Sequence, residues 1–132
     1  MGNNICEVLH NNGNKTNPNI LIERHQMKKY STVEQAAMVS KAAIYVTGCG
    51  GGAVTSTFLP TGSALMVYYS EQGGIQNNRM VGTPARLDWD YFNNMAYVRV
   101  TWLSHLTMKK AKDIEGFVQL MLHEIDMIQR AR

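Results

Sequence analysis

The sequence predicts an α/β fold in which helices cover both faces of a mostly parallel β-sheet. Two short stretches, residues 43–47 and 64–69, are largely apolar, as expected for strands that are buried on both faces. Helical and extended patterns alternate along the chain, which is typical of parallel sheets with helical connections. With 132 residues, 45% of them apolar and 17% charged, the chain suits one ordinary globular core.

Short elements precede the first of these strands. Residues 19–23 form an apolar run that predicts a buried strand, and residues 1–18 form a separate N-terminal segment of helix and loop. Ser31 and Glu34 have the spacing of a capping box, so we expect a helix that starts there and ends near Lys41. Small residues share the face of this helix that would pack on the sheet: Val33, Ala36, Ala37 and Ser40.

The second half of the chain continues the alternation. Residues 71–84 are rich in Gly, Asn and Gln and predict a long loop, after which Asp88 is expected to cap a short helix. Residues 97–102 alternate, which predicts a strand with one exposed face near a sheet edge. A longer helix is expected from Asp113, because one apolar stripe follows it: Ile114, Phe117, Val118, Met121, Ile125 and Ile128. Residues 19–132 are therefore expected to form one Rossmann-like domain.

A glycine-rich turn joins the two central strands. Gly48, Gly50, Gly51 and Gly52 follow the first strand directly, and a short helix is expected to begin after them. Glycines allow close approach of a ligand to the backbone, and a helix N-terminus attracts anions. The turn therefore predicts a site for a phosphate or another anion.

The same turn also fits a dinucleotide fingerprint. Gly48, Gly50 and Ala53 have the required spacing, and Glu71 lies about where an acidic residue would hold a ribose. Against this interpretation, the segment between Gly52 and Pro60 has room for only about two helical turns, whereas a crossover normally takes a dozen residues or more. A strand and a helix are also expected before the turn, although the fingerprint usually opens its domain.

Other classes of site find little support in the sequence. The net charge of +3 permits an anionic ligand, but no dense basic stripe predicts nucleic-acid binding. No metal site is predicted, because Asp88 and Asp90 suit a helix start and His123-Glu124 lacks the second His of a zinc motif. Cys6 and Cys49 form no disulfide framework. Neither a signal peptide nor a transmembrane segment is expected in this chain.

Residues 34–63 carry a family resemblance. A helix with Glu34-Gln35, an apolar strand and a glycine loop are followed by Phe58-Leu59-Pro60 and then Gly62-Ser63. This order resembles the C-terminal domain of glycosyltransferase family 61, and Cys49 stands where that family has a loop His. An aromatic stretch at residues 88–92, followed by Tyr97-Val98, is similar to the downstream part of such domains.

The resemblance implies one half of a GT-B fold that binds a UDP-sugar, with no further cofactor and no metal. Its sugar would pass, with inversion, to a hydroxyl of a protein or polysaccharide acceptor, and the acceptor-binding N-terminal domain would be missing here. The diphosphate would contact the backbone of Gly50, Gly51, Gly52 and Ala53 and the Thr55 hydroxyl. Cys49 would occupy the catalytic His position, and Glu71 lies nearest to the ribose.

The resemblance also implies the lumen of the Golgi or the endoplasmic reticulum. Two other interpretations stay open. The chain could be a Rossmann-like binding or structural domain without catalysis, or a dinucleotide-binding domain of an NAD-type oxidoreductase.

Overall fold

A computed structural model describes residues 20–48, 51–69, 86–104 and 111–131, with the backbone alone at 51–52, 86–89, 104 and 111–113. Three strands, β1 (Ile44–Gly48), β2 (Ala64–Tyr69) and β3 (Arg99–Ser104), form a parallel sheet in the order β1-β2-β3. The prediction of an α/β fold with a parallel sheet is confirmed. β1 lies within one residue of its expected range, and β2 matches its range.

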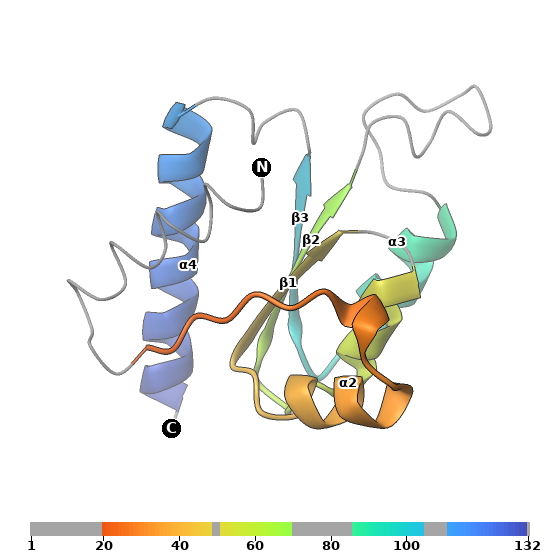
Figure 1. Cartoon of the computed structure of the whole chain (residues 1–132). Helices are drawn as coiled ribbons and strands as arrows, with labels where there is room; N and C mark the ends of the chain where they lie inside the picture. The colour runs from red at the N-terminus through yellow and green to blue at the C-terminus, as the bar shows by residue number, and fades with distance from the viewer. Residues whose placement is uncertain (1–19, 49–50, 70–85, 105–110, 132) are drawn as a thin grey trace.

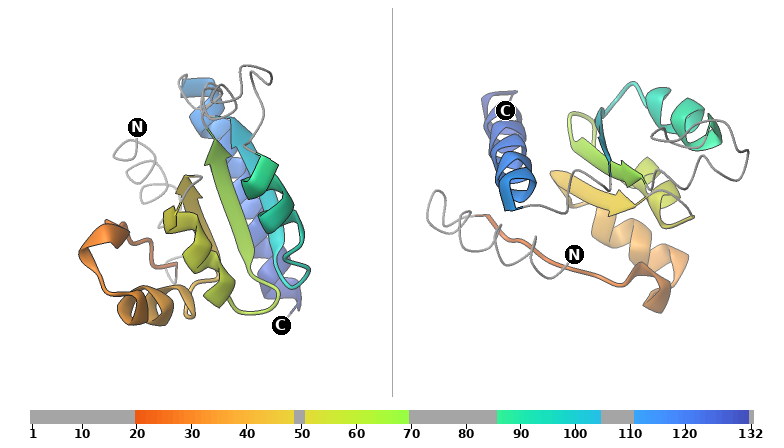
Figure 2. Two further views of the ribbon diagram at one scale, coloured as in Figure 1. Left: turned by 90° about the vertical axis from the view of Figure 1, so that its right-hand side faces the viewer. Right: turned by 90° about the horizontal axis from the view of Figure 1, so that it is seen from above.

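Helices cover both faces of the sheet (Figure 1). A single long helix, α4 (Ala111–Ala131), lies on one face, and Figure 2 shows it standing apart from the shorter helices. The other face carries α2 (Thr32–Val39), the 3₁₀ helix η2 (Gly51–Phe58) and α3 (Arg86–Asn93). A further 3₁₀ turn, η1 (Met27–Lys29), precedes α2.

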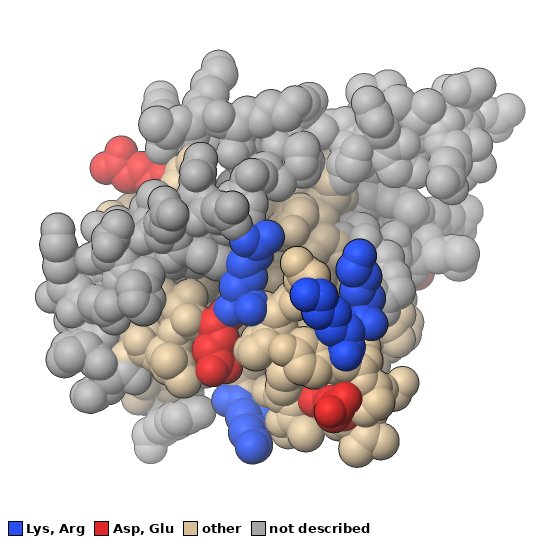
Figure 3. Space-filling model, viewed as in Figure 1, with Lys and Arg blue, Asp and Glu red and all other residues tan. Residues whose placement is uncertain are grey.

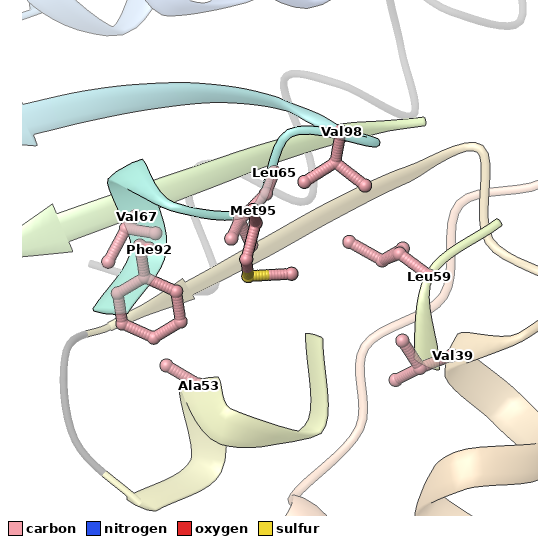
Figure 4. Close-up of a cluster of buried hydrophobic side chains, with 8 residues drawn as sticks. All are labelled: Val39, Ala53, Leu59, Leu65, Val67, Phe92, Met95 and Val98. Carbon is pink, nitrogen blue, oxygen red and sulfur yellow. The ribbon is translucent and has the colours of Figure 1, made fainter. Parts of the chain in front are cut away.

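The central strand β2 supplies both cores. Leu65 and Val67 belong to the cluster beneath the short helices, whereas Met66 belongs to the cluster beneath α4. All three side chains are fully buried, as expected for a strand that is covered on both faces. Figure 4 shows the first cluster, which gathers side chains from four elements and the segments next to them: Val39, Ala53, Leu59, Leu65, Val67, Phe92, Met95 and Val98.

The capping box of α2 is confirmed. The Ser31 backbone N–H donates to the Glu34 carboxylate at 2.7 Å, and the Glu34 N–H donates to the Ser31 hydroxyl at 3.3 Å. The expected packing face of this helix is wrong, because Val33 is 79% exposed and Val39 is buried. α2 packs mainly against η2 rather than directly on the sheet, and a different side of the helix is therefore covered.

Two further predictions about element boundaries are wrong. Residues 20–26 form no strand, because only Ile22 packs against the α4-side cluster while Leu21 is 79% exposed. Asp88 does not cap α3, which already begins at Arg86 and therefore contains Asp88 in its first turn.

The last strand and the last helix follow the predicted pattern in most respects. β3 begins two residues later than expected, because Tyr97 and Val98 form a turn in which the Val98 N–H donates to the Met95 carbonyl. Its place at a sheet edge is confirmed among the described strands. The expected exposed face is wrong, because Leu103 packs against the α4-side cluster and Arg99 pairs with Glu124 of α4. The apolar stripe of α4 is also confirmed, with its most buried members facing the sheet: Phe117, Val118, Met121 and Ile128.

The helix after the glycine turn is a 3₁₀ helix with a period of three. Ala53, Ser56 and Leu59 are buried; Ala53 points toward Phe92, and Leu59 points into the middle of the cluster (Figure 4). Glycine and β-branched residues are poor α-helix formers, so the segment GGAVTSTF has little intrinsic preference for an α-helix. Because side chains three apart lie above one another in a 3₁₀ helix, this spacing places one row of side chains in the core.

Candidate functional site

The carboxyl ends of the three parallel strands meet at one edge of the sheet, where open α/β sheets commonly bind ligands. Gly48 ends β1 and pairs with Tyr68 of β2. A Cβ atom at Gly48 would lie 3.2 Å from the Tyr68 ring, which is tighter than an ordinary contact. Glycine at this position therefore lets the aromatic ring pack beside the end of the strand.

The helix that follows begins at this same edge. η2 starts at Gly51, three residues after the end of β1. The first N–H groups of a helix have no partner within the helix, and its N-terminus carries a partial positive charge. Ala53 is buried in the core beneath the short helices, so this end of η2 is fixed against the sheet.

Thr55 has a contact inside the fold. Its side chain is buried, and its hydroxyl donates to Gln35 Oε1 at 3.0 Å. The Gln35 amide nitrogen donates in turn to the carbonyls of Met27 and Tyr30, at 2.8 and 3.0 Å. Gln35 thereby joins η1, α2 and η2. This bond uses the hydroxyl hydrogen of Thr55, so the hydroxyl oxygen could only accept a further hydrogen bond. The predicted contact between Thr55 and a diphosphate stays a prediction.

The remaining predicted site residues are not brought together by the described part of the chain. Cys49, Gly50 and Glu71 lie outside the described residues, and their roles stay predictions. Gly51 and Gly52 are described by their backbone in the first turn of η2.

An open hollow of about 590 Å³ lies elsewhere, between the last turns of η2 and α3. Its lining comes from both helices and from the turn before β3: Thr57, Asp90, Tyr91, Asn94, Met95 and Tyr97. Thr57 is six residues after Gly51, so the hollow is displaced from the glycine turn by roughly 12 Å along η2, at a 3₁₀ rise of about 2 Å per residue. The hollow and the predicted anion site therefore lie toward opposite ends of one helix.

Two ionisable clusters were not anticipated from the sequence. Arg99 at the start of β3 pairs with Glu124 of α4, whose carboxylate oxygen lies 2.8 Å from both Nε and Nη2. Near η1, His25 lies 3.3 Å from both the Tyr30 hydroxyl and the Glu23 carboxylate. Arg99 and Glu124 are 25 residues apart, so no local spacing signals their contact. Among the described residues, no three His, Cys, Asp or Glu side chains are close enough to hold a metal ion.

Burial shifts the pKa of two tyrosines. Loss of water raises the pKa of Tyr45 above its ordinary value of 10.0, an effect that a hydrogen bond with Thr47 opposes. Burial and the neighbouring Tyr91 raise the pKa of Tyr97 in the same direction. Both phenols therefore stay protonated at neutral pH and can donate hydrogen bonds. On the face drawn in Figure 3, acidic and basic side chains of the described residues lie close to one another among uncharged ones.

A search with family models finds no match for this chain, and searches of curated proteins and of solved structures find none either. Among the helices that the structure describes, none combines the length and apolarity that a membrane span requires.

Proposed function

We propose that the chain binds the diphosphate of a UDP-sugar at the turn between β1 and η2. In this proposal it is the Rossmann-like C-terminal half of a GT-B glycosyltransferase. The observation that carries the proposal is the β1–η2–β2 unit, in which a parallel strand ends at Gly48 and a helix of eight residues begins at Gly51. The resemblance of residues 34–63 to glycosyltransferase family 61 supports the choice of ligand.

The proposed chemistry needs stabilisation of the charge on the departing UDP. Backbone N–H groups of Gly50, Gly51, Gly52 and Ala53 would supply it, because fixed donors stabilise developing negative charge without a metal. Glu71 would contact the ribose, and Cys49 would stand near the phosphates in place of a His. A glycan or protein hydroxyl would attack the sugar within a site that an acceptor-binding domain completes. The resemblance would place this reaction in the Golgi or the endoplasmic reticulum.

A thermal-shift titration of the full chain tests the donor site. Ligands that bind only the folded state raise its stability by RT ln(1 + [L]/Kd), which is about 2.7 kcal/mol at one hundred times Kd. We expect UDP and UDP-sugars at millimolar concentration to raise the melting temperature more than NAD does. No stabilisation by any uridine nucleotide, together with a clear shift by NAD, would sink the proposal in favour of a dinucleotide site.

Two glycine variants form a matched pair for this titration. Gly51→Leu places a side chain in the first turn of η2, whereas Gly116→Leu places the same side chain on α4, where a Cβ would meet no atom within 4 Å. We expect the first variant to lose the shift with UDP and the second to keep it. Circular dichroism shows whether each variant is folded.

The alternative of a binding or structural domain without catalysis has one observation in its favour. Thr55 and Ala53 are both engaged in packing η2 onto its neighbours. If the turn were only structural, Gly51→Leu would change the melting temperature of the free protein, and the wild type would give no shift with UDP.

A further inference from the structure

The hollow between η2 and α3 is wide open to solvent, so a ligand would lie on its surface rather than be enclosed. Its volume of about 590 Å³ falls within the range of roughly 300–1,000 Å³ that is usual for such sites. Met95 is buried and forms part of the lining, while the Tyr91 side chain is 40% exposed. The Tyr91 ring meets the Phe92 ring edge-on, with centroids 5.0 Å apart, and Phe92 is itself in the core. The hollow therefore presents a supported aromatic surface.

The polar groups of the lining already donate to the protein. The Tyr97 hydroxyl donates to the Thr57 carbonyl at 2.8 Å, and the Thr57 hydroxyl donates to the Val54 carbonyl at 2.9 Å. The Asn94 amide nitrogen donates to the Asp90 carbonyl. Each of the three side chains keeps an oxygen lone pair that can accept a hydrogen bond. A ligand can therefore donate hydrogen bonds to all three side chains, and the second amide N–H of Asn94 can donate to it in turn.

The charge of the lining gives a cation little advantage over a neutral ligand. Asp90 is the one ionisable carboxylate among the lining residues, and it already takes part in another interaction within the molecule. Tyr97 stays neutral at physiological pH, since burial raises the pKa of its hydroxyl above the ordinary value of 10.0. Asp90 is exposed, and an ion pair between a ligand cation and an exposed carboxylate contributes little.

We infer that this hollow binds the ring of a neutral sugar, a monosaccharide unit of a glycan. A pyranose has a face of C–H groups that can lie on the Tyr91 ring and a rim of hydroxyls that can donate to Tyr97, Thr57 and Asn94. This inference stands without the proposed donor site, from which the hollow is separated along η2.

Saturation-transfer NMR of the full chain tests the inference. The probes are the methyl glycosides of glucose, galactose and xylose and N-acetylglucosamine, each at millimolar concentration, with N-acetyl-arginine amide as the cationic comparison. We expect transfer to the ring protons of at least one sugar and none to the arginine derivative. Tyr91→Phe keeps the aromatic surface and should keep the signal, whereas Tyr91→Leu should weaken binding about tenfold or more.

Met127→Leu is the matched control, because Met127 is also 40% exposed but lies on α4. It should bind the sugar as the wild type does. Transfer to the arginine derivative alone, transfer to no sugar, or equal loss in Tyr91→Leu and Met127→Leu would each overturn the inference. Addition of saturating UDP separates the two sites, since sugar binding in the hollow should be unchanged whether or not UDP itself binds.

Discussion

The two faces of the sheet are covered in different ways. One face is covered by three short helices, and its core draws on α2, η2, β2, α3 and the segments that flank them. The other face is covered by α4 alone, whose apolar stripe packs on Met66 and its neighbours. Hydrogen bonds of Gln35 join the short helices of the first face, whereas α4 is joined to the sheet by the Arg99–Glu124 ion pair.

Both candidate sites depend on the face that is covered by the short helices. Both the glycine turn and the hollow belong to η2, so their shape depends on the core beneath the short helices. α4 contributes apolar burial and one ion pair, and no lining residue of the hollow comes from it. Changes beneath the short helices should therefore alter ligand binding as well as stability, whereas changes beneath α4 should alter stability alone.

The largest expected effect comes from deleting a core ring on each face. Phe92→Ala and Phe117→Ala each remove a buried aromatic side chain, at a cost of about 3–5 kcal/mol in the free energy of unfolding. Urea unfolding measures both losses. At low temperature, where both variants are still folded, we expect sugar binding to fail in Phe92→Ala and to persist in Phe117→Ala. The reverse order of binding would contradict the division between the two faces.

The ion pair of α4 gives the next largest effect. Glu124→Ala leaves the Arg99 guanidinium, 38% exposed, without its carboxylate, and we expect a loss of about 1–3 kcal/mol. Asp126→Ala removes the exposed partner of Arg130 on the same helix, and should cost no more than about 0.5 kcal/mol. Chemical denaturation compares the two. Equal losses would mean that the Arg99–Glu124 pair behaves as an ordinary surface pair.

A double variant tests whether the loss of stability comes from an unpaired charge or from lost packing. Arg99→Met with Glu124→Leu replaces both charges by apolar groups of similar size, and such replacements are often close to neutral. We expect the double variant to be more stable than Glu124→Ala, because no charge is left without a partner. A double variant as unstable as the single one would assign the effect to lost packing instead.

Local patterns in the sequence predict the helices, strands and caps that depend on residues close together in the chain. The period of α4, the apolar run of β2 and the Ser31–Glu34 box each depend on residues close in sequence, and all three are confirmed. The run at residues 19–23 fails because strand formation needs a neighbouring strand, which no local pattern specifies. The face of α2 fails for the same reason, since its partner is η2 and not the sheet.

The candidate sites depend even more on contacts between distant residues. Thr57 and Tyr97 are 40 residues apart, and their hydrogen bond forms one wall of the hollow. Thr55 and Gln35 are 20 residues apart, so the contact that fixes η2 on α2 has no sequence spacing to reveal it. The three-residue spacing of Ala53, Ser56 and Leu59 is local and fits the 3₁₀ helix, although the sequence predicts only a short helix of unspecified type here.

The capping box of α2, on the first face, should have a smaller effect on stability, and this effect should depend on pH. Ser31→Ala should cost about 1 kcal/mol, since it leaves the Glu34 N–H without its acceptor. Hydrogen bonds from Ser31 hold the pKa of Glu34 below its ordinary value of 4.5. The contribution of the Glu34 charge is therefore fully present above pH 4.5 and is lost as the pH falls below that value.

The variant Glu34→Gln measures this dependence. Its melting temperature should fall below that of the wild type at neutral pH, and the two should converge in acid as the wild-type carboxyl takes up its proton. A difference that persists unchanged in strong acid would show that the charge of Glu34 has no part in the effect. Because α2 packs on η2, Ser31→Ala should also weaken sugar binding slightly.

The smallest expected effect on stability comes from replacing two glycines, one with open space around it and one beside an aromatic ring. Gly116 lies in the middle of α4, where a Cβ would meet no atom within 4 Å, so Gly116→Ala should raise stability by about 0.5–1 kcal/mol. Gly48→Ala should lower stability, because its Cβ would press on the Tyr68 ring at 3.2 Å. Urea unfolding gives the sign of each change. The Gly116→Ala variant should bind UDP and sugars as the wild type does, whereas a shifted Tyr68 ring in Gly48→Ala should disturb the UDP response at the adjoining turn. Loss of either ligand in Gly116→Ala would mean that α4 is coupled to the sites after all.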